Sequence, residues 1–103
     1  MSQVALKELQ RIPGVGPSIA RDLLALGFTQ VSELRGRDPE KLYARSNNLR
    51  GQVQDRCLLY VFRCAVYFAE EARPQRERLK WWNWTDEKMG RKPKPRSRAL
   101  SRR

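Results

Sequence analysis

The chain has 103 residues, enough for one small domain, and its 22 Lys and Arg against 11 Asp and Glu give a formal net charge of +11. It has no histidine, its two cysteines are too few for a disulfide scaffold, and its most apolar run, residues 57–69, is too short to cross a membrane. We therefore expect a soluble, cytoplasmic protein that does not contact membranes.

The positive charge lies mostly at the C-terminus. Residues 1–87 hold 14 basic and 11 acidic side chains, a net charge of +3, whereas residues 88–103 hold eight basic side chains and no acidic one. A block of like charge with one large aliphatic side chain, Leu100, cannot offset its ordering entropy. We expect a folded domain over residues 1–87 and a disordered polybasic tail over residues 88–103.

Four short helices are predicted in the first half of the chain from their caps and apolar spacing. They begin, in order, near Ser2, Gly16, Thr29 and Asp38, and they end near Pro13, Gly27, Gly36 and Ala44. Proline at the first helical position is expected after both Gly16 and Asp38.

The second half is predicted to contain a turn over residues 47–51, a long helix over residues 52–72 and a last short helix over residues 77–84. The long helix is apolar on every side between Cys57 and Ala69, so it should lie at the centre of the domain. No segment alternates with a period of two. The predicted fold is an all-α compact bundle of five or six short helices.

The strongest chemical signal is a glycine hairpin between the first two helices, at Ile12-Pro-Gly-Val-Gly16. Backbone amides at a helix N-terminus attract a phosphate oxygen, and glycine lets a nucleic-acid backbone approach closely. The donors expected to bind phosphate are those of Gly14, Val15, Gly16, Ser18 and Ile19, with a charged contact from Arg21. The alternative is a tight turn that serves protein packing and binds no ligand.

These residues resemble the helix-hairpin-helix family, which binds DNA without sequence specificity through its phosphates. Over residues 3–86, including Lys80-Trp-Trp-Asn-Trp84, the chain also resembles the small bacterial "pathogenicity locus" helix-hairpin-helix proteins. Those proteins are in turn similar to the C-terminal domain of TfoX-type competence regulators. The resemblance implies an all-α domain that contains a helix-hairpin-helix motif.

The resemblance also implies a second, degenerate hairpin over residues 42–57. Its turn would be Leu49-Arg50-Gly51, and Gln52 would begin its second helix. Arg50, Gly51 and Gln52 are therefore candidates for a second phosphate contact, although this turn lacks the Pro-Gly-x-Gly signature.

Trp81, Trp82 and Trp84 form an aromatic cluster near several basic residues. They could stack on unpaired bases or contact a partner, but we expect at least two of them to close the core. Neighbouring positions on a helix diverge by about 100°, so all three cannot point inward.

The basic tail is expected to add non-specific attraction to nucleic acid through Lys92, Lys94, Arg96 and Arg98. An anionic membrane surface is a weaker alternative, because no amphipathic helix or lipid site accompanies the tail, and plain solubility is the other. No catalytic constellation, cofactor motif or metal-ligand set is recognisable, and we expect Cys57 and Cys64 to be buried small hydrophobes.

Together these features predict a non-enzymatic protein that binds nucleic acid, chiefly DNA, without sequence specificity. The alternative is a protein-interaction adaptor in DNA uptake, repair or regulation. Clustering of Arg11, Arg21, Arg50 and Arg56 near the hairpins would favour DNA, and an apolar patch lined by tryptophans would favour a protein.

Overall fold

The computed structural model describes residues 3–89, which contain helices and no strand. Its four α-helices are α1 (Gln3–Leu9), α2 (Pro17–Ala25), α3 (Pro39–Arg50) and α4 (Arg56–Glu70). Three single-turn 3-10 helices accompany them: η1 (Val31–Leu34), η2 (Arg76–Leu79) and η3 (Trp81–Trp84). The all-α class is confirmed, whereas the predicted five or six helices are four α-helices and three 3-10 turns. The Ser2 cap and the tail residues from 90 onward lie outside the described range.

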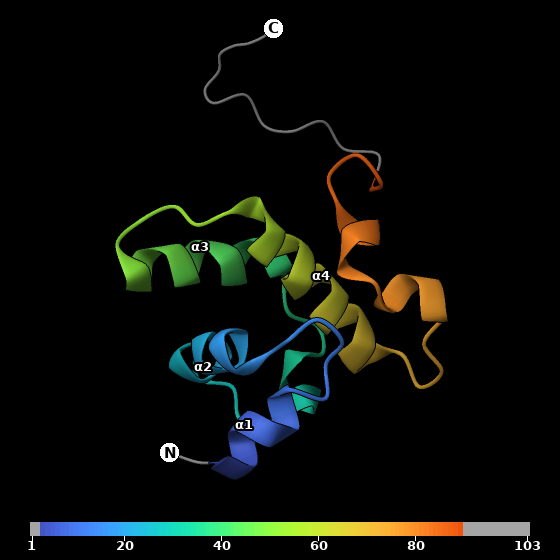
Figure 1. Ribbon diagram of the computed structural model, residues 1–103, viewed down its shortest axis with the longest axis horizontal. Coiled ribbons are helices and arrows are strands. Elements are labelled where there is room, and N and C mark those ends of the chain that lie inside the picture. Colours follow the sequence, from blue (N-terminus) through green and yellow to red (C-terminus); the bar gives the residue numbers. More distant parts are fainter. Residues whose placement is uncertain (1–2, 90–103) are drawn as a thin grey trace, which may run out of the picture.

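The centre of the fold is α4, as its apolar sequence predicted. Every residue from Val61 to Val66 is buried, and the Phe62 side chain is fully enclosed. This helix contacts α3, η1, η2 and η3, while α1 and α2 pack together beside them (Figure 1). No helix among residues 3–89 is long and apolar enough to cross a membrane.

The starts of α2 and α3 follow the predicted capping residues, whereas α1 ends at Leu9, before the predicted Pro13. Gly16 is the N-cap of α2 with Pro17 at its first position, and Gly27, at φ +100°, follows its end. The Asp38 side chain caps α3 by accepting a hydrogen bond from the Glu40 amide. The short third helix is a 3-10 turn whose N-cap is Gln30, not Thr29.

The junction of α3 and α4 differs from the prediction. Residues 47–50, expected in a turn, continue α3, which ends at Gly51 in the left-handed conformation. Helix α4 then begins four residues later than predicted, because the Asp55 side chain caps it by accepting from the Cys57 amide. The Asn47 carboxamide holds the intervening loop by accepting hydrogen bonds from Gln54.

The predicted last helix over residues 77–84 is interrupted. Lys80 adopts an extended backbone, φ −96° and ψ 116°, which separates η2 from η3. A continuous helix would point the three tryptophans in directions fixed by the helical repeat. The interruption instead allows Trp81 and Trp84 to pack in two different places, described below.

Candidate functional site

The glycine hairpin between α1 and α2 presents several backbone amides without an internal acceptor. The first bond of α2 runs from the Ala20 amide to the Gly16 carbonyl at 2.9 Å. Within residues 3–89, the amides of Gly14, Gly16, Ser18 and Ile19 donate to no protein acceptor. The Val15 amide is already used, because it donates to the Ile12 carbonyl at 3.1 Å, and the Val15 side chain is buried. Four of the five predicted donors are therefore free to bind a ligand.

The two glycines of the hairpin have different environments. Gly14 has φ +87°, and a Cβ added there would lie 3.2 Å from Cδ1 of Trp81. Gly16 has φ −96°, which any residue adopts, and a Cβ added there would meet nothing within 4 Å. Gly14 is required by the turn and by Trp81, whereas the described fold places no such demand on Gly16.

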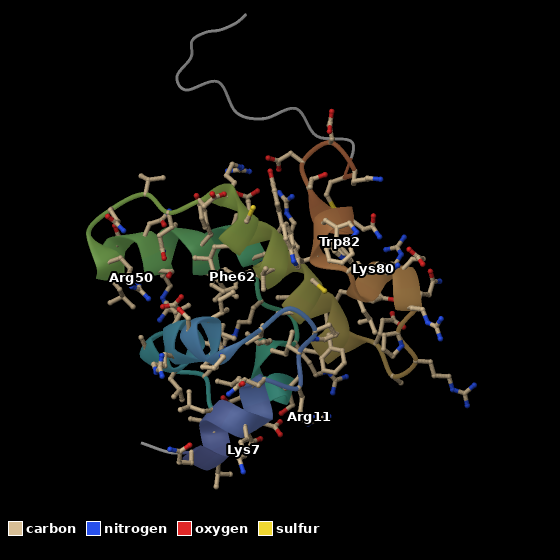
Figure 2. The ribbon with its side chains drawn as sticks, viewed as in Figure 1. Lys7, Arg11, Arg50, Phe62, Lys80 and Trp82 are labelled. Carbon is tan, nitrogen blue, oxygen red and sulfur yellow. The ribbon has the colours of Figure 1, made fainter. Side chains whose placement is uncertain are left out.

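The four arginines whose clustering near the hairpins would favour DNA binding do not cluster there. Arg21 lies exposed on α2 without an ion pair among the described residues. Arg11 pairs with Glu8 at 3.1 Å, Arg50 with Asp22, and Arg56 with Asp86 at 2.9 Å. Figure 2 shows Arg11 and Arg50 in separate parts of the molecule. Of the four predicted cations, only Arg21 is both beside the hairpin and without an ion pair.

The turn between α3 and α4 does not reproduce the first hairpin. The amides of Gly51 and Gln52 donate to the Asn48 and Asn47 carbonyls and so close the end of α3. The Arg50 guanidinium is held by Asp22, which raises the pKa of Arg50. The backbone amides of Gly51 and Gln52 are therefore not free to bind a second phosphate, and the Arg50 side chain is already in an ion pair.

The tryptophans separate into two packed side chains and one exposed one. Trp81 is half-buried against Gly14, and the Trp84 ring lies 5.4 Å from that of Tyr67 while its Nε1 donates to the Arg78 carbonyl at 2.7 Å. Trp82 is 53% exposed and meets Trp81 edge to face, with ring centroids 5.7 Å apart. We expected at least two tryptophans to close the core, but only Trp81 packs against it, and Trp84 packs on Tyr67.

A buried ion-pair network, absent from the sequence predictions, ties the C-terminal segment to α4. Arg63 is buried and its guanidinium donates to Asp86 at 2.8 Å, to the Trp84 carbonyl at 2.7 Å and to Glu40 at 3.2 Å. Arg56 contacts the same Asp86 carboxylate. The one sequence feature that could have indicated this network is Arg63, a charged residue within the most apolar run of the chain.

This network should make the fold sensitive to acid. Burial raises the pKa of Asp86, but the hydrogen bonds from Arg56 and Arg63 lower it further, so the net pKa lies below the ordinary value of 3.8. The stability that the carboxylate contributes is complete above its unfolded-state pKa and is lost as the pH falls through the lower folded-state value. We expect the free energy of unfolding to decrease below about pH 4.

Urea denaturation of the wild type and Asp86→Asn across this acid range measures the effect, and the decrease should be shallower in the variant. Part of the slope should remain, because backbone amides of Val31 and Thr29 lower the pKa values of Glu8 and Glu33. Equal slopes in the two proteins would show that Asp86 does not titrate in this way.

Both cysteines were expected to be buried, and this prediction is correct for one of them. Cys64 is buried, and burial raises its pKa to about 11, whereas Cys57 is exposed at the start of α4.

No group of three or more Cys, Asp or Glu side chains that could hold a metal ion occurs in the described part of the chain. The predicted tail contacts Lys92, Lys94, Arg96 and Arg98 lie outside the described residues.

Comparison with known proteins gives a family and one curated relative. A family model described as "Pathogenicity locus" matches residues 2–90. A "Mitomycin resistance protein McrB" from Streptomyces lavendulae is 40% identical over 83 residues, which cover 79% of this chain and 73% of that protein. No solved structure matches.

Proposed function

The chain belongs to the pathogenicity locus family, and we propose that it is a non-enzymatic protein that binds DNA without sequence specificity through a helix-hairpin-helix phosphate site. The proposed motif comprises α1, the hairpin and α2. A phosphate would accept hydrogen bonds from the free amides of Gly16, Ser18 and Ile19, and Arg21 would add a charged contact. The similarity to TfoX-type regulators remains a prediction.

The observation that carries the proposal is Gly16. A serine or aspartate there would cap α2 with its side chain, and the backbone conformation and the open space around Gly16 both allow one. Glycine leaves α2 without a side-chain cap and its first amides uncovered. A phosphate oxygen can use those amides only where no side chain occupies them. A ligand that comes close to the backbone at the start of α2 would account for glycine at this position, and this supports the proposal.

Few side chains at the hairpin are placed to recognise base edges. Its donors are backbone amides, which contact phosphate and carry no sequence information. Arg21 is the one exposed charged side chain within residues 14–21. We therefore expect similar affinity for unrelated duplex sequences, with a marked decrease as salt increases.

Gly16→Asp should separate binding from folding. The new carboxylate would occupy the free amides and repel phosphate, so affinity for a generic duplex should fall at least about tenfold, since hydrogen bonds to charged groups contribute about 1.5–3 kcal/mol each. The free energy of unfolding should rise by about a few tenths of a kcal/mol, because aspartate is a better N-cap than glycine.

Fluorescence anisotropy with labelled duplex and urea denaturation measure the two effects. Ser32→Asp is the matched control, since it adds the same charge at an exposed position on η1. If the Gly16→Asp protein is stable and binds duplex as well as the control does, the hairpin does not take part in DNA binding.

A protein-interaction adaptor is the second candidate. It is favoured by two exposed apolar side chains near the α3–α4 turn, Leu49 at 61% and Val53 at 84% exposure. The name of the curated relative suggests a cellular readout, survival on mitomycin, for both candidates. If survival depends on Leu49 and Val53 but is unaffected by Gly16→Asp, the adaptor is favoured; the reverse pattern favours DNA binding.

A further inference from the structure

The exposed tryptophan lies close to the glycine hairpin although more than 60 residues separate them in the sequence. Trp81 packs over Gly14, and the Trp82 ring meets the Trp81 ring at a centroid distance of 5.7 Å and an interplanar angle of 85°. One side chain, Trp81, thus separates the ring of Trp82 from Gly14 of the hairpin. The fold connects an exposed aromatic ring to the hairpin that carries the free amides.

Trp82 is held in place but is not needed to close the core. The backbone on either side is fixed, since the Asn83 amide donates to the Lys80 carbonyl at 2.9 Å and Arg63 donates to the Trp84 carbonyl. The Trp82 indole N–H donates to no acceptor within residues 3–89, and 53% of the side chain is exposed. A preorganised, solvent-facing ring loses little conformational freedom when it stacks on a ligand.

The surroundings of Trp82 favour a nucleobase over an apolar protein surface. Residues 76–80 carry three cations and a single carboxylate, Glu77, which pairs with Lys80 at 3.2 Å, so the segment that precedes Trp82 keeps a net positive charge. Cations with an aromatic ring are the combination that binds single-stranded nucleic acid, where backbone attraction and base stacking act together. The faces of bases inside an intact duplex are covered by their neighbours, so only an unpaired base offers a face to Trp82.

We propose that Trp82 stacks on an unpaired base while the hairpin amides hold a phosphate of the same strand. The ligand class is then single-stranded DNA, or a duplex with an unpaired nucleotide. This inference rests on the proposed function, because it takes the phosphate from the hairpin site and adds the base.

The test compares Trp82→Leu with Trp82→Phe. Leucine keeps the apolar bulk but removes the aromatic face, whereas phenylalanine keeps a face that can stack. Stacking on an aromatic side chain is worth about five- to a hundredfold in affinity per base. We expect affinity for a short oligo(dT) strand to fall by this factor in Trp82→Leu, and by clearly less in Trp82→Phe. Any loss for a blunt duplex should be smaller than the loss for the single strand.

A second readout assigns the contact to one ring. The three indole N–H signals in an NMR titration with oligo(dT) distinguish Trp82 from Trp84, whose Nε1 is bonded to the Arg78 carbonyl and serves as an internal control. Trp82 should shift strongly and Trp84 weakly. Val53→Ala, at another exposed apolar side chain, is the matched substitution control.

The outcomes separate this inference from the proposed function. If Gly16→Asp weakens binding of both DNA forms and Trp82→Leu weakens neither, the hairpin site stands and base stacking is overturned. Equal losses for strand and duplex in Trp82→Leu also overturn stacking on an unpaired base. If neither variant affects either DNA form, both proposals fall. A Trp82→Leu protein that binds DNA normally but no longer binds a protein partner would assign Trp82 to the adaptor.

Discussion

Asp86→Ala is expected to lower the free energy of unfolding by about 3 kcal/mol, because it removes one partner of a buried ion pair. Arg63 would remain buried with its charge facing the position that Asp86 leaves. The expected loss lies at the low end for such changes, since Glu40 and the Trp84 carbonyl still contact the guanidinium. For a domain of this size, the melting temperature should fall by roughly 12–24 °C.

Thermal and urea denaturation of Asp86→Ala measure this loss. Glu87→Ala is the matched control, because it removes the same charge at the next residue, which is exposed. The control should differ from the wild type by less than about 0.5 kcal/mol. If the two variants are equally stable, the network does not hold the C-terminal segment on α4.

The same substitution, serine for glycine, should have opposite effects at the two hairpin positions. At Gly14 it forces a side chain into the left-handed region and against Trp81, which costs about 1–3 kcal/mol. At Gly16 the conformation is ordinary and the space open, and serine can cap α2, so stability should rise by about a few tenths of a kcal/mol.

Urea denaturation of Gly14→Ser and Gly16→Ser measures this difference, and near-ultraviolet circular dichroism of the tryptophans reports the Trp81 contact. The spectrum should change in Gly14→Ser and stay as in the wild type in Gly16→Ser. Similar losses of stability at both positions would mean that Gly16 is required by the fold, and the argument for a ligand there would fail.

Local signals predicted the parts of the fold that depend on neighbouring residues. Gly16, Pro17 and Asp38 mark helix starts because their own side chains and dihedral angles decide the cap. The central position of α4 was predictable because this helix is apolar on every side, and such a helix must be surrounded by the rest of the domain. The hairpin was recognisable for the same reason, since its glycines lie within a few residues of one another.

The parts that were missed depend on contacts between distant residues. A turn was expected over residues 47–51, but α3 continues to Arg50, and Gln54 donates hydrogen bonds to the Asn47 side chain. The pairing of Arg63 with Asp86 joins residues 23 apart, and only the charge in an apolar run hinted at it. Nothing local indicated that Trp81 would cover Gly14. The sequence predictions therefore describe the glycine hairpin and the tryptophans separately, whereas the fold brings them together.

The most direct test of DNA binding at the hairpin is an NMR titration of the full chain with a generic duplex at two salt concentrations. Phosphate binding at the helix N-terminus predicts that the largest amide shifts centre on Gly14, Gly16, Ser18 and Ile19, and that they weaken as salt increases. Shifts confined to the tail residues 90–103, or centred on Leu49 and Val53, with the hairpin amides unmoved, would contradict it.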